Sequence, residues 1–461
     1  MPLHLAGTVG SRQRDLTGAS LRNWAHARPR LASLLLALGI TVLGSVLAYL
    51  RVPPVSARTV WAEDGRVFLQ EYLAQGPGLL NPYDGYLHLL PRSLVAVVVP
   101  VFGIEAYPLA ITVACSIALG LIAALTFHCS SALSDNTAAR LCWASIPILV
   151  APGALETMAN VANLHWYLLW LAPWVLMKSP SAPWEKILLG ATALAISLTE
   201  IQAALFLPLV FFRWKDRNLL WAKAGLAVGI ACQLVTLRMY PRTSGGTGEQ
   251  GDILSVVYGY FLNTSSALID GSSAVIGRHV SDFGALPVLL CALPFAAAIG
   301  LLCCFGTRDQ LFAGATWLLA SIALWSAAVV INPAPYFHYA RFDTPQDWAG
   351  FFLSRYSTVP SMFLLALLPL LIARRRTVPA TARRWGSPLQ HPSFRWGVVA
   401  AFAALQTMHF FPIDAARTTG PEWAAQVQAG REACAADPAL DAVQIVQAPD
   451  GWLTTLSCAD L

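Results

Sequence analysis

The sequence predicts an all-α polytopic membrane protein with about 11 transmembrane helices. Hydrophobic residues make up 56% of its 461 residues, and charged residues make up only 12%. Apolar runs long enough to cross a bilayer recur along the chain, and the basic residues gather in short stretches beside them. Because the net charge of +5 comes from these stretches, we expect no nucleic-acid partner.

The first predicted helix covers residues 31–50, an uninterrupted apolar run. Several arginines precede it, and no small-residue cleavage site follows it, so we interpret it as an uncleaved first span. The positive-inside rule then places the N-terminal segment, residues 1–30, in the cytoplasm. The first loop, residues 51–106, falls on the outer side.

This first outer loop is predicted to hold two helices that lie in the membrane interface. Within 66–75, Phe68, Leu69, Tyr72 and Leu73 share one helical face. The second helix lies within 85–103 and has a proline near its first turn. If it crossed the membrane, every later segment would change sides and the basic stretches would no longer lie inside.

The later spans follow from two basic anchors that should face the cytoplasm, RWKDR at 213–217 and the arginine-rich stretch from Arg374 to Arg395. The run 187–212 is interrupted by polar residues around Glu200, so we predict two short helices that meet at the outer face. One long tilted helix is the alternative. The remaining predicted spans are 107–127, 141–153, 164–177, 219–238, 286–306, 311–332, 358–373 and 396–412.

Residues 413–461 form a small acidic tail that the charge pattern places outside. Cys434 and Cys458 both lie in it, and two cysteines in a short segment on an oxidising side predict a disulfide. The chain therefore divides into the segment 1–30, a transmembrane domain at 31–412 and this tail. We expect an integral protein of a bacterial plasma membrane, with its N-terminus inside and its C-terminus outside.

Polar side chains from distant segments gather near the predicted outer ends of the spans. Such groups are costly at membrane depth unless they line a shared, hydrated cavity. Carboxylates there can accept a proton, and arginines can bind an anionic phosphate. The densest acidic pair is Glu63-Asp64 in WAEDG, directly after the first span.

This predicted arrangement resembles the GT-C superfamily of integral-membrane glycosyltransferases. The shared features are an N-inside first helix, an outer loop that opens with an acidic pair, two interfacial helices and many later spans. The resemblance covers residues 30–375. It implies a polyprenyl-linked sugar donor, a glycan, lipid or protein acceptor, and inversion in a single displacement with Asp64 as base and Glu63 beside it. The chain lacks a WWDYG-like motif and a sizeable soluble C-terminal domain, so it is more similar to the smaller, single-sugar members.

Further site residues are assigned by charge and position in the predicted outer segments. The candidates for binding the donor phosphate are Arg92, His88, Arg355 and Arg341. The candidates for binding substrate are Tyr83, Tyr86, Glu156, Asn163, His165 and Glu200. No cofactor is assigned, and a divalent metal stays open because carboxylates and a lipid phosphate can share one.

Each assignment has a simpler alternative. The acidic pair can cap the helix that follows it, and the arginines can be interface anchors. Two other functions also stay open, a lipid-linked glycan polymerase or ligase and a transporter or flippase. A transporter would carry ionisable residues near the centres of its spans, whereas these spans are nearly free of charge.

Overall fold

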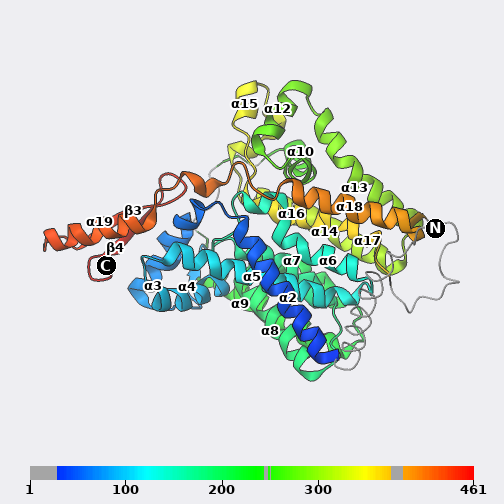
Figure 1. The fold of residues 1–461 in the computed structure, drawn as a ribbon, viewed down its shortest axis with the longest axis horizontal. Helices are drawn as coiled ribbons and strands as arrows, with labels where there is room; N and C mark the ends of the chain where they lie inside the picture. Colours follow the sequence, from blue (N-terminus) through cyan, green and yellow to red (C-terminus); the bar gives the residue numbers. More distant parts are fainter. Residues whose placement is uncertain (1–28, 243–247, 250, 375–387) are drawn as a thin grey trace, which may run out of the picture.

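The computed structural model describes residues 29–242, 248–249, 251–374 and 388–461. The predicted cytoplasmic segment up to residue 28 and most of the arginine-rich stretch after Arg374 lie outside the described residues. The described chain is mostly helical (Figure 1), and six of its helices are long and apolar enough to cross a membrane. They are α2 (Pro29–Leu50), α5 (Tyr107–Cys129), α6 (Thr137–Leu149) together with the short 3-10 helix that extends it to Ala154, α9 (Leu220–Met239), α13 (Leu286–Phe305) and α14 (Arg308–Ile331).

The other predicted crossings correspond to shorter elements, which do not meet that length criterion. They are α7 (Leu164–Met177), α8 (Pro183–Thr199), the 3-10 helix η5 (Ile201–Phe211), α16 (Thr358–Leu365), α17 (Leu367–Leu370) and α18 (Pro392–Met408). Every residue of α7 is buried, so this helix forms the centre of the bundle. Its Trp174 ring lies 4.6 Å from that of Trp317 on α14. A helix enclosed by protein can be short and apolar without contacting lipid.

The predicted interruption of the run 187–212 is present at Glu200. This residue is extended, with φ −143° and ψ 116°. Its side chain accepts a hydrogen bond from the backbone N–H of Gln202 and so caps the start of η5. At the far end of η5, Phe212 stacks on Phe312 in the first turns of α14, with 4.8 Å between ring centroids. The chain therefore turns at Glu200 and runs back as a second short helix, as the two-helix interpretation predicts.

The first loop contains the two predicted helices together with a hairpin that was not predicted. A π-helix, η2 (Asp64–Leu69), continues into α3 (Gln70–Gln75), and α4 (Leu89–Phe102) follows the pairing of β1 (Pro82–Tyr83) with β2 (Tyr86–Leu87). Phe68 and Leu69 are buried, so this part of the expected membrane-facing side packs inside the protein.

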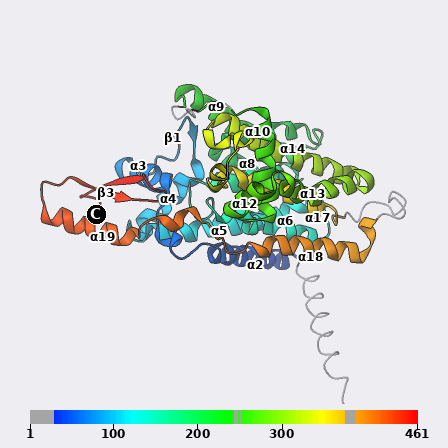
Figure 2. The same cartoon turned by 90° about the horizontal axis from the view of Figure 1, so that it is seen from above.

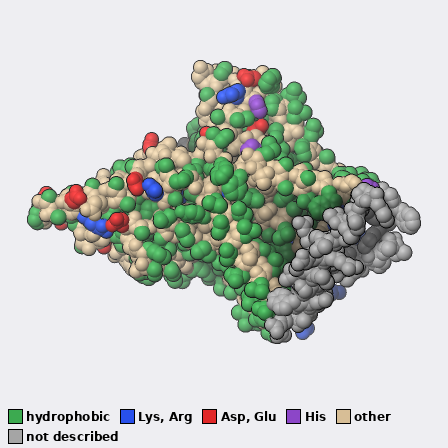
Figure 3. Space-filling model, in the orientation of Figure 1, with side chains coloured by type: hydrophobic (Ala, Val, Ile, Leu, Met, Phe, Trp, Pro, Cys, Tyr) green, Lys and Arg blue, Asp and Glu red, His purple; other side chains and the backbone are tan. Residues whose placement is uncertain are grey.

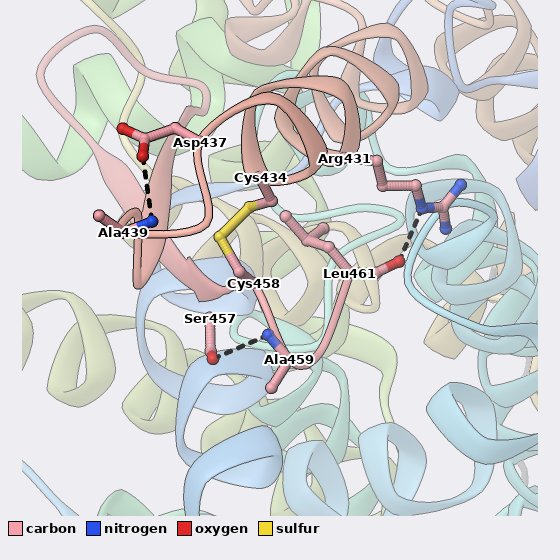
Figure 4. Close-up of a disulfide and its surroundings, with 8 residues drawn as sticks. All are labelled: Arg431, Cys434, Asp437, Ala439, Ser457, Cys458, Ala459 and Leu461. Carbon is pink, nitrogen blue, oxygen red and sulfur yellow. Dashed lines mark hydrogen bonds between the residues drawn. A yellow bond between two sulfur atoms is a disulfide. The ribbon is translucent and has the colours of Figure 1, made fainter.

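The tail 413–461, hereafter the C-terminal lobe, folds as α19 (Trp423–Ala436) against the antiparallel strands β3 (Ala442–Val446) and β4 (Leu453–Ser457). The predicted bond between Cys434 and Cys458 is present and ties α19 to the end of β4 (Figure 4). The two small hairpins are the departure from the all-α prediction.

Two views show the lobe projecting from one end of the helical body (Figures 1 and 2). A second projection is formed by α10 (Ile253–Phe261), α12 (Ser273–Phe283) and α15 (Pro345–Ala349). On the face shown in Figure 3, charged side chains lie mainly on these two projections, and hydrophobic side chains cover much of the body between them. This distribution fits a helical body embedded in lipid.

The lobe is anchored to the rest of the protein by buried polar contacts. Trp423 is buried, and its Nε1 donates to the Ile104 carbonyl at 2.8 Å. The Ala62 amide donates to the Ala448 carbonyl at 2.6 Å. The buried guanidinium of Arg417 donates to carbonyls of Ser56 and Thr59, at 2.5 and 2.6 Å. The lobe therefore packs directly against the loop that carries Glu63 and Asp64.

Candidate functional site

A cavity of about 290 Å³, hereafter the first cavity, lies where several helix ends meet. Its walls include the start of α7, the break after α8, the last turns of α9 and α14, and the segment before α16. The sequence places all of these ends on the same side of the membrane. Most of the predicted site residues line it: Glu63, Tyr83, Tyr86, His88, Asn163, His165, Glu200 and Arg355.

An ion pair joins two walls of this cavity. Glu63 Oε1 lies 3.3 Å from Arg355 Nη1, while Glu63 Oε2 is buried and has no hydrogen-bond partner. Although burial alone would lower it, the nearby Glu63, Tyr356 and Glu156 raise the pKa of Arg355 well above its usual value, so the guanidinium stays charged. Glu156 also accepts a hydrogen bond from the Arg355 amide at 2.8 Å, which holds the backbone at this position.

Asp64, the predicted base, does not line the first cavity and is only 2% exposed. Its two carboxylate oxygens accept hydrogen bonds from the amides of Val161 and Ala162, at 3.0 and 2.9 Å. These amides precede α7, so Asp64 stabilises the start of that helix instead of its own. Desolvation by burial raises the pKa of Asp64 to about 7, against the lowering effects of the Ala162 amide and Arg417.

The difference between the two acids arises in η2, which begins at Asp64. Tyr107 donates its hydroxyl to the Asp64 carbonyl at 2.8 Å and holds this turn against α5. With the backbone held there, the side chain of Glu63 reaches the cavity and that of Asp64 reaches the backbone before α7. A π-helical turn is a common irregularity at functional sites.

Residues lining the cavity present several buried polar atoms that have no hydrogen-bond partner. Glu200 Oε2 lies 3.6 Å from His165 Nε2, too far for a hydrogen bond. The unpartnered atoms are Glu63 Oε2, Asn163 Nδ2, His165 Nδ1, Glu200 Oε2 and Gln202 Oε1. Most buried polar groups in folded proteins are satisfied by protein or water, so this cluster offers hydrogen-bonding groups to water or to a polar ligand in the cavity.

Aromatic rings form another wall. His88 lies 4.1 Å from Tyr86 and 5.5 Å from Tyr83, measured between ring centroids. Trp166 contacts Tyr356 edge to face at 5.7 Å. Desolvation by burial lowers the pKa of His88 to about 3, so its ring is neutral and supplies an aromatic surface instead of the expected positive charge. Flat ring faces of this kind suit a sugar.

Arg242 is a lining residue that the sequence did not single out. Its Nε lies 2.7 Å from Asp84 Oδ2, and its Nη2 donates to Asn332 Oδ1 at 2.7 Å. The available signal was a basic residue just beyond the outer end of the predicted span 219–238, where the positive-inside rule predicts few. The first cavity thus holds the guanidiniums of Arg242 and Arg355 together with several carboxylates.

Two predicted phosphate ligands lie elsewhere. Arg92 is buried behind the aromatic wall, where it pairs with Glu71 at 2.7 Å and covers the Phe68 ring. Arg341 has a side chain that is 57% exposed and that pairs with Glu249 at 3.4 Å. Neither lines the first cavity, so the guanidiniums available there are those of Arg242 and Arg355.

A second cavity of about 460 Å³ shares Glu63, Arg355 and Tyr356 with the first. Glu156, the remaining predicted substrate residue, lines this second cavity.

Within the described part of the chain, no three side chains of His, Cys, Asp or Glu come together as a metal site.

The arrangement combines a buried carboxylate that can accept a proton, guanidiniums that can bind an anion and rings that can stack on a sugar. The carboxylate and one guanidinium belong to both cavities, so groups bound on either side would meet at the Glu63–Arg355 pair. No protein-family model, no curated protein and no solved structure matches this chain.

Proposed function

We propose that this protein is a membrane glycosyltransferase that moves a sugar from a polyprenyl-phosphate-linked donor to an acceptor hydroxyl at the outer face of the membrane. The observation that carries the proposal is the Glu63–Arg355 pair, which lies where the two cavities meet and leaves one carboxylate oxygen unpartnered. A base next to a fixed cation is what displacement of a phosphate by a hydroxyl requires.

The first cavity suits the donor because the last turns of two candidate spans contribute to its wall. Leu237 on α9 and Ile331 on α14 line it, so a polyprenyl chain leaving the cavity would enter the lipid beside these helices. Arg242 and Arg355 would bind the phosphate. The sugar would lie between Tyr83 and Tyr86 and the polar side chains of Asn163, His165 and Glu200.

In the reaction, the acceptor oxygen bonds to C1 of the sugar as the bond between C1 and the phosphate oxygen breaks. The acceptor proton passes to Glu63 Oε2, and the leaving polyprenyl phosphate keeps the electron pair beside Arg355. Attack opposite the phosphate inverts the configuration at C1. Glu63 takes this role in place of Asp64, because both oxygens of Asp64 already accept backbone hydrogen bonds.

The proposal includes the complete topology of about 11 crossings, N-terminus inside and C-terminus outside, in a bacterial plasma membrane. Six candidate spans and the return of the chain at Glu200 support it. The short helix α7 counts as a crossing because neighbouring helices, not lipid, enclose it.

The test is donor cleavage by the purified protein in nanodiscs, with a panel of synthetic polyprenyl-phosphate sugars. We expect protein-dependent release of polyprenyl phosphate for one sugar, an inverted glycosidic bond in the product, and loss of both in Glu63→Gln. Glycan chains extended by whole lipid-linked units would instead indicate a polymerase or ligase. Movement of intact donor across the bilayer without cleavage would indicate a flippase.

A further inference from the structure

The second cavity differs from the first in which parts of the chain enclose it. Its walls come from the segment at Trp61 to Glu63, the residues after α6, the segments around Tyr336 and Arg355, and the C-terminal lobe. None of these lining residues belongs to one of the six candidate spans, whereas two residues of the first cavity do. A ligand would therefore enter the second cavity from the aqueous side and not along a lipid chain.

The C-terminal lobe supplies one wall of this cavity through Pro449 and Trp452. Trp452 lies in the turn between β3 and β4, and the guanidinium of Arg66 in η2 covers its ring at 5.5 Å from the centroid. Elsewhere in the lining, the Tyr336 ring packs against Phe352 at 5.0 Å between centroids. Trp61 also lines the cavity. Aromatic side chains from four separate segments, at Trp61, Tyr336, Phe352 and Trp452, thus surround one space.

The polar groups of this cavity are suited to hydroxyls. Trp61 Nε1, Ser354 Oγ and Glu63 Oε2 are buried and lack a hydrogen-bond partner, which supplies a donor, a hydroxyl and an acceptor. All three residues are at most 9% exposed. Unsatisfied buried groups of this kind are costly unless a ligand or water satisfies them.

The charges of the cavity disfavour an anionic ligand. Glu63, Glu156 and Asp414 contribute carboxylates, while Arg355 contributes one guanidinium that already pairs with two of them. A phosphate or uronate would meet net negative charge there. Stacking faces, hydroxyl-binding groups and an acidic lining together describe a site for an uncharged sugar.

Resting on the proposed function, we infer that the second cavity is the acceptor site, that it takes the non-reducing end of a neutral, water-exposed glycan, and that Trp452 of the C-terminal lobe selects it. The acceptor hydroxyl would reach Glu63 Oε2 from the side opposite the donor. The lobe would thereby determine which acceptor is used, while the helix ends determine the donor.

Binding can be tested without turnover by saturation-transfer NMR on the purified full chain. The probes are methyl glycosides of neutral hexoses and pentoses, short neutral oligosaccharides, and methyl glucuronides as anionic counterparts. We expect saturation of at least one neutral probe and at least tenfold weaker binding of the glucuronides. Trp452→Ala and Tyr336→Ala should each weaken binding at least tenfold, and Trp452→Phe should restore much of it.

Trp184→Ala is the matched control because this tryptophan is 61% exposed and lines neither cavity. Neutral probes that bind equally well to Trp452→Ala and Tyr336→Ala would overturn the inference, as would equal binding of the glucuronides. Either result leaves donor cleavage by the wild-type protein intact. Failure of donor cleavage with probe binding retained would instead overturn the proposed function, and the second cavity would remain a site for a neutral sugar without the role of acceptor site.

Discussion

Glu63 and Arg355 are 292 residues apart in the sequence, yet their side chains meet at 3.3 Å. One lies in the first loop and the other just before α16, and the pair lies between the two cavities. Both cavities therefore depend on the same contact. A change at this pair should affect chemistry on both sides, whereas a change in one wall should affect only one ligand.

The first prediction separates the two neighbouring acids. Glu63→Gln keeps the shape of the side chain and its contact with Arg355 but cannot accept the acceptor proton, so sugar transfer should fall by about 100- to 10,000-fold. Asp64→Asn should keep transfer within about tenfold of wild type and lower the melting temperature, because its NH₂ group can no longer accept one of the two hydrogen bonds from the amides of Val161 and Ala162. Transfer rates in nanodiscs and thermal unfolding measure the two effects. The opposite pattern would return the role of base to Asp64.

Sequence reasoning reached the membrane class, the break at Glu200, the disulfide and eight of the residues that line the first cavity, because each depends on local composition or on the side of the membrane. Hydropathy and charge determine which helix ends lie on the same side of the membrane. They do not determine where a side chain points. Glu63 faces the first cavity and Asp64 does not, because of a π-helical turn and of backbone amides almost 100 residues away. No local sequence pattern predicts either feature.

The missed residues have the same cause. Arg242 follows α9 in the sequence like an ordinary loop residue. Only the meeting of the ends of α9 and α14 at the first cavity brings it to Asn332. The lobe was predicted as a stapled tail, but its contact with the first loop depends on side chains such as Gln447, whose Nε2 donates to the Ala62 carbonyl at 3.1 Å. His88 was predicted to bind phosphate as a cation, but its burial lowers its pKa to about 3. Residue spacing does not predict this burial among aromatic rings.

The second prediction concerns Arg242 as a ligand of the donor phosphate. Arg242→Ala should weaken donor binding by at least tenfold, and Arg242→Lys should recover only part of it, because lysine cannot keep the contacts to Asp84 and Asn332 while also binding phosphate. Acceptor binding should not change. The measurement is the KM for the donor at saturating acceptor. Arg341→Ala is the control, since this exposed arginine lies outside both cavities, and an equal effect there would contradict the assignment.

The third prediction is a pH dependence of stability that comes from Asp64. Its pKa is raised from 3.8 in the unfolded chain to about 7 in the folded protein. Between these values the folded state keeps a proton that the unfolded state has lost, so the Asp64 contribution to stability falls as the pH rises from about 4 to about 7 and then stays constant. Other buried carboxylates also titrate, so the test is a difference. The melting temperature of wild type should fall more steeply over this range than that of Asp64→Asn, and equal slopes would contradict the prediction.

The fourth prediction concerns the disulfide of the C-terminal lobe. Cys434 and Cys458 close a loop of 24 residues, and removing such a link destabilises the folded state by about 3 kcal/mol in the chain-entropy model. In the double variant with serine at both positions, amide hydrogen exchange should accelerate in α19, β3 and β4. Exchange in the helical body should stay unchanged. Unaltered exchange in the lobe would mean that its contacts with the first loop hold it without the covalent link.

The fifth prediction uses Gly65, which has an ordinary helical backbone and lies where η2 meets the lobe. A Cβ added there would come too close to Gln447 Oε1 and Thr454 Oγ1 of the lobe. Thr454 is fully buried and short, so it cannot rotate away, and the lobe must move instead.

Gly65→Ala should therefore raise the KM for a neutral acceptor several-fold and leave the KM for the donor unchanged, because the displaced lobe carries Trp452 but no residue of the first cavity. Faster hydrogen exchange in β4 would report the displacement independently of activity. Gly300→Ala on α13 is the matched control, since a Cβ there meets no atom within 4 Å. If Gly65→Ala changes donor and acceptor KM equally, the lobe does not act on one side of the Glu63–Arg355 pair, and the division into donor and acceptor cavities is wrong.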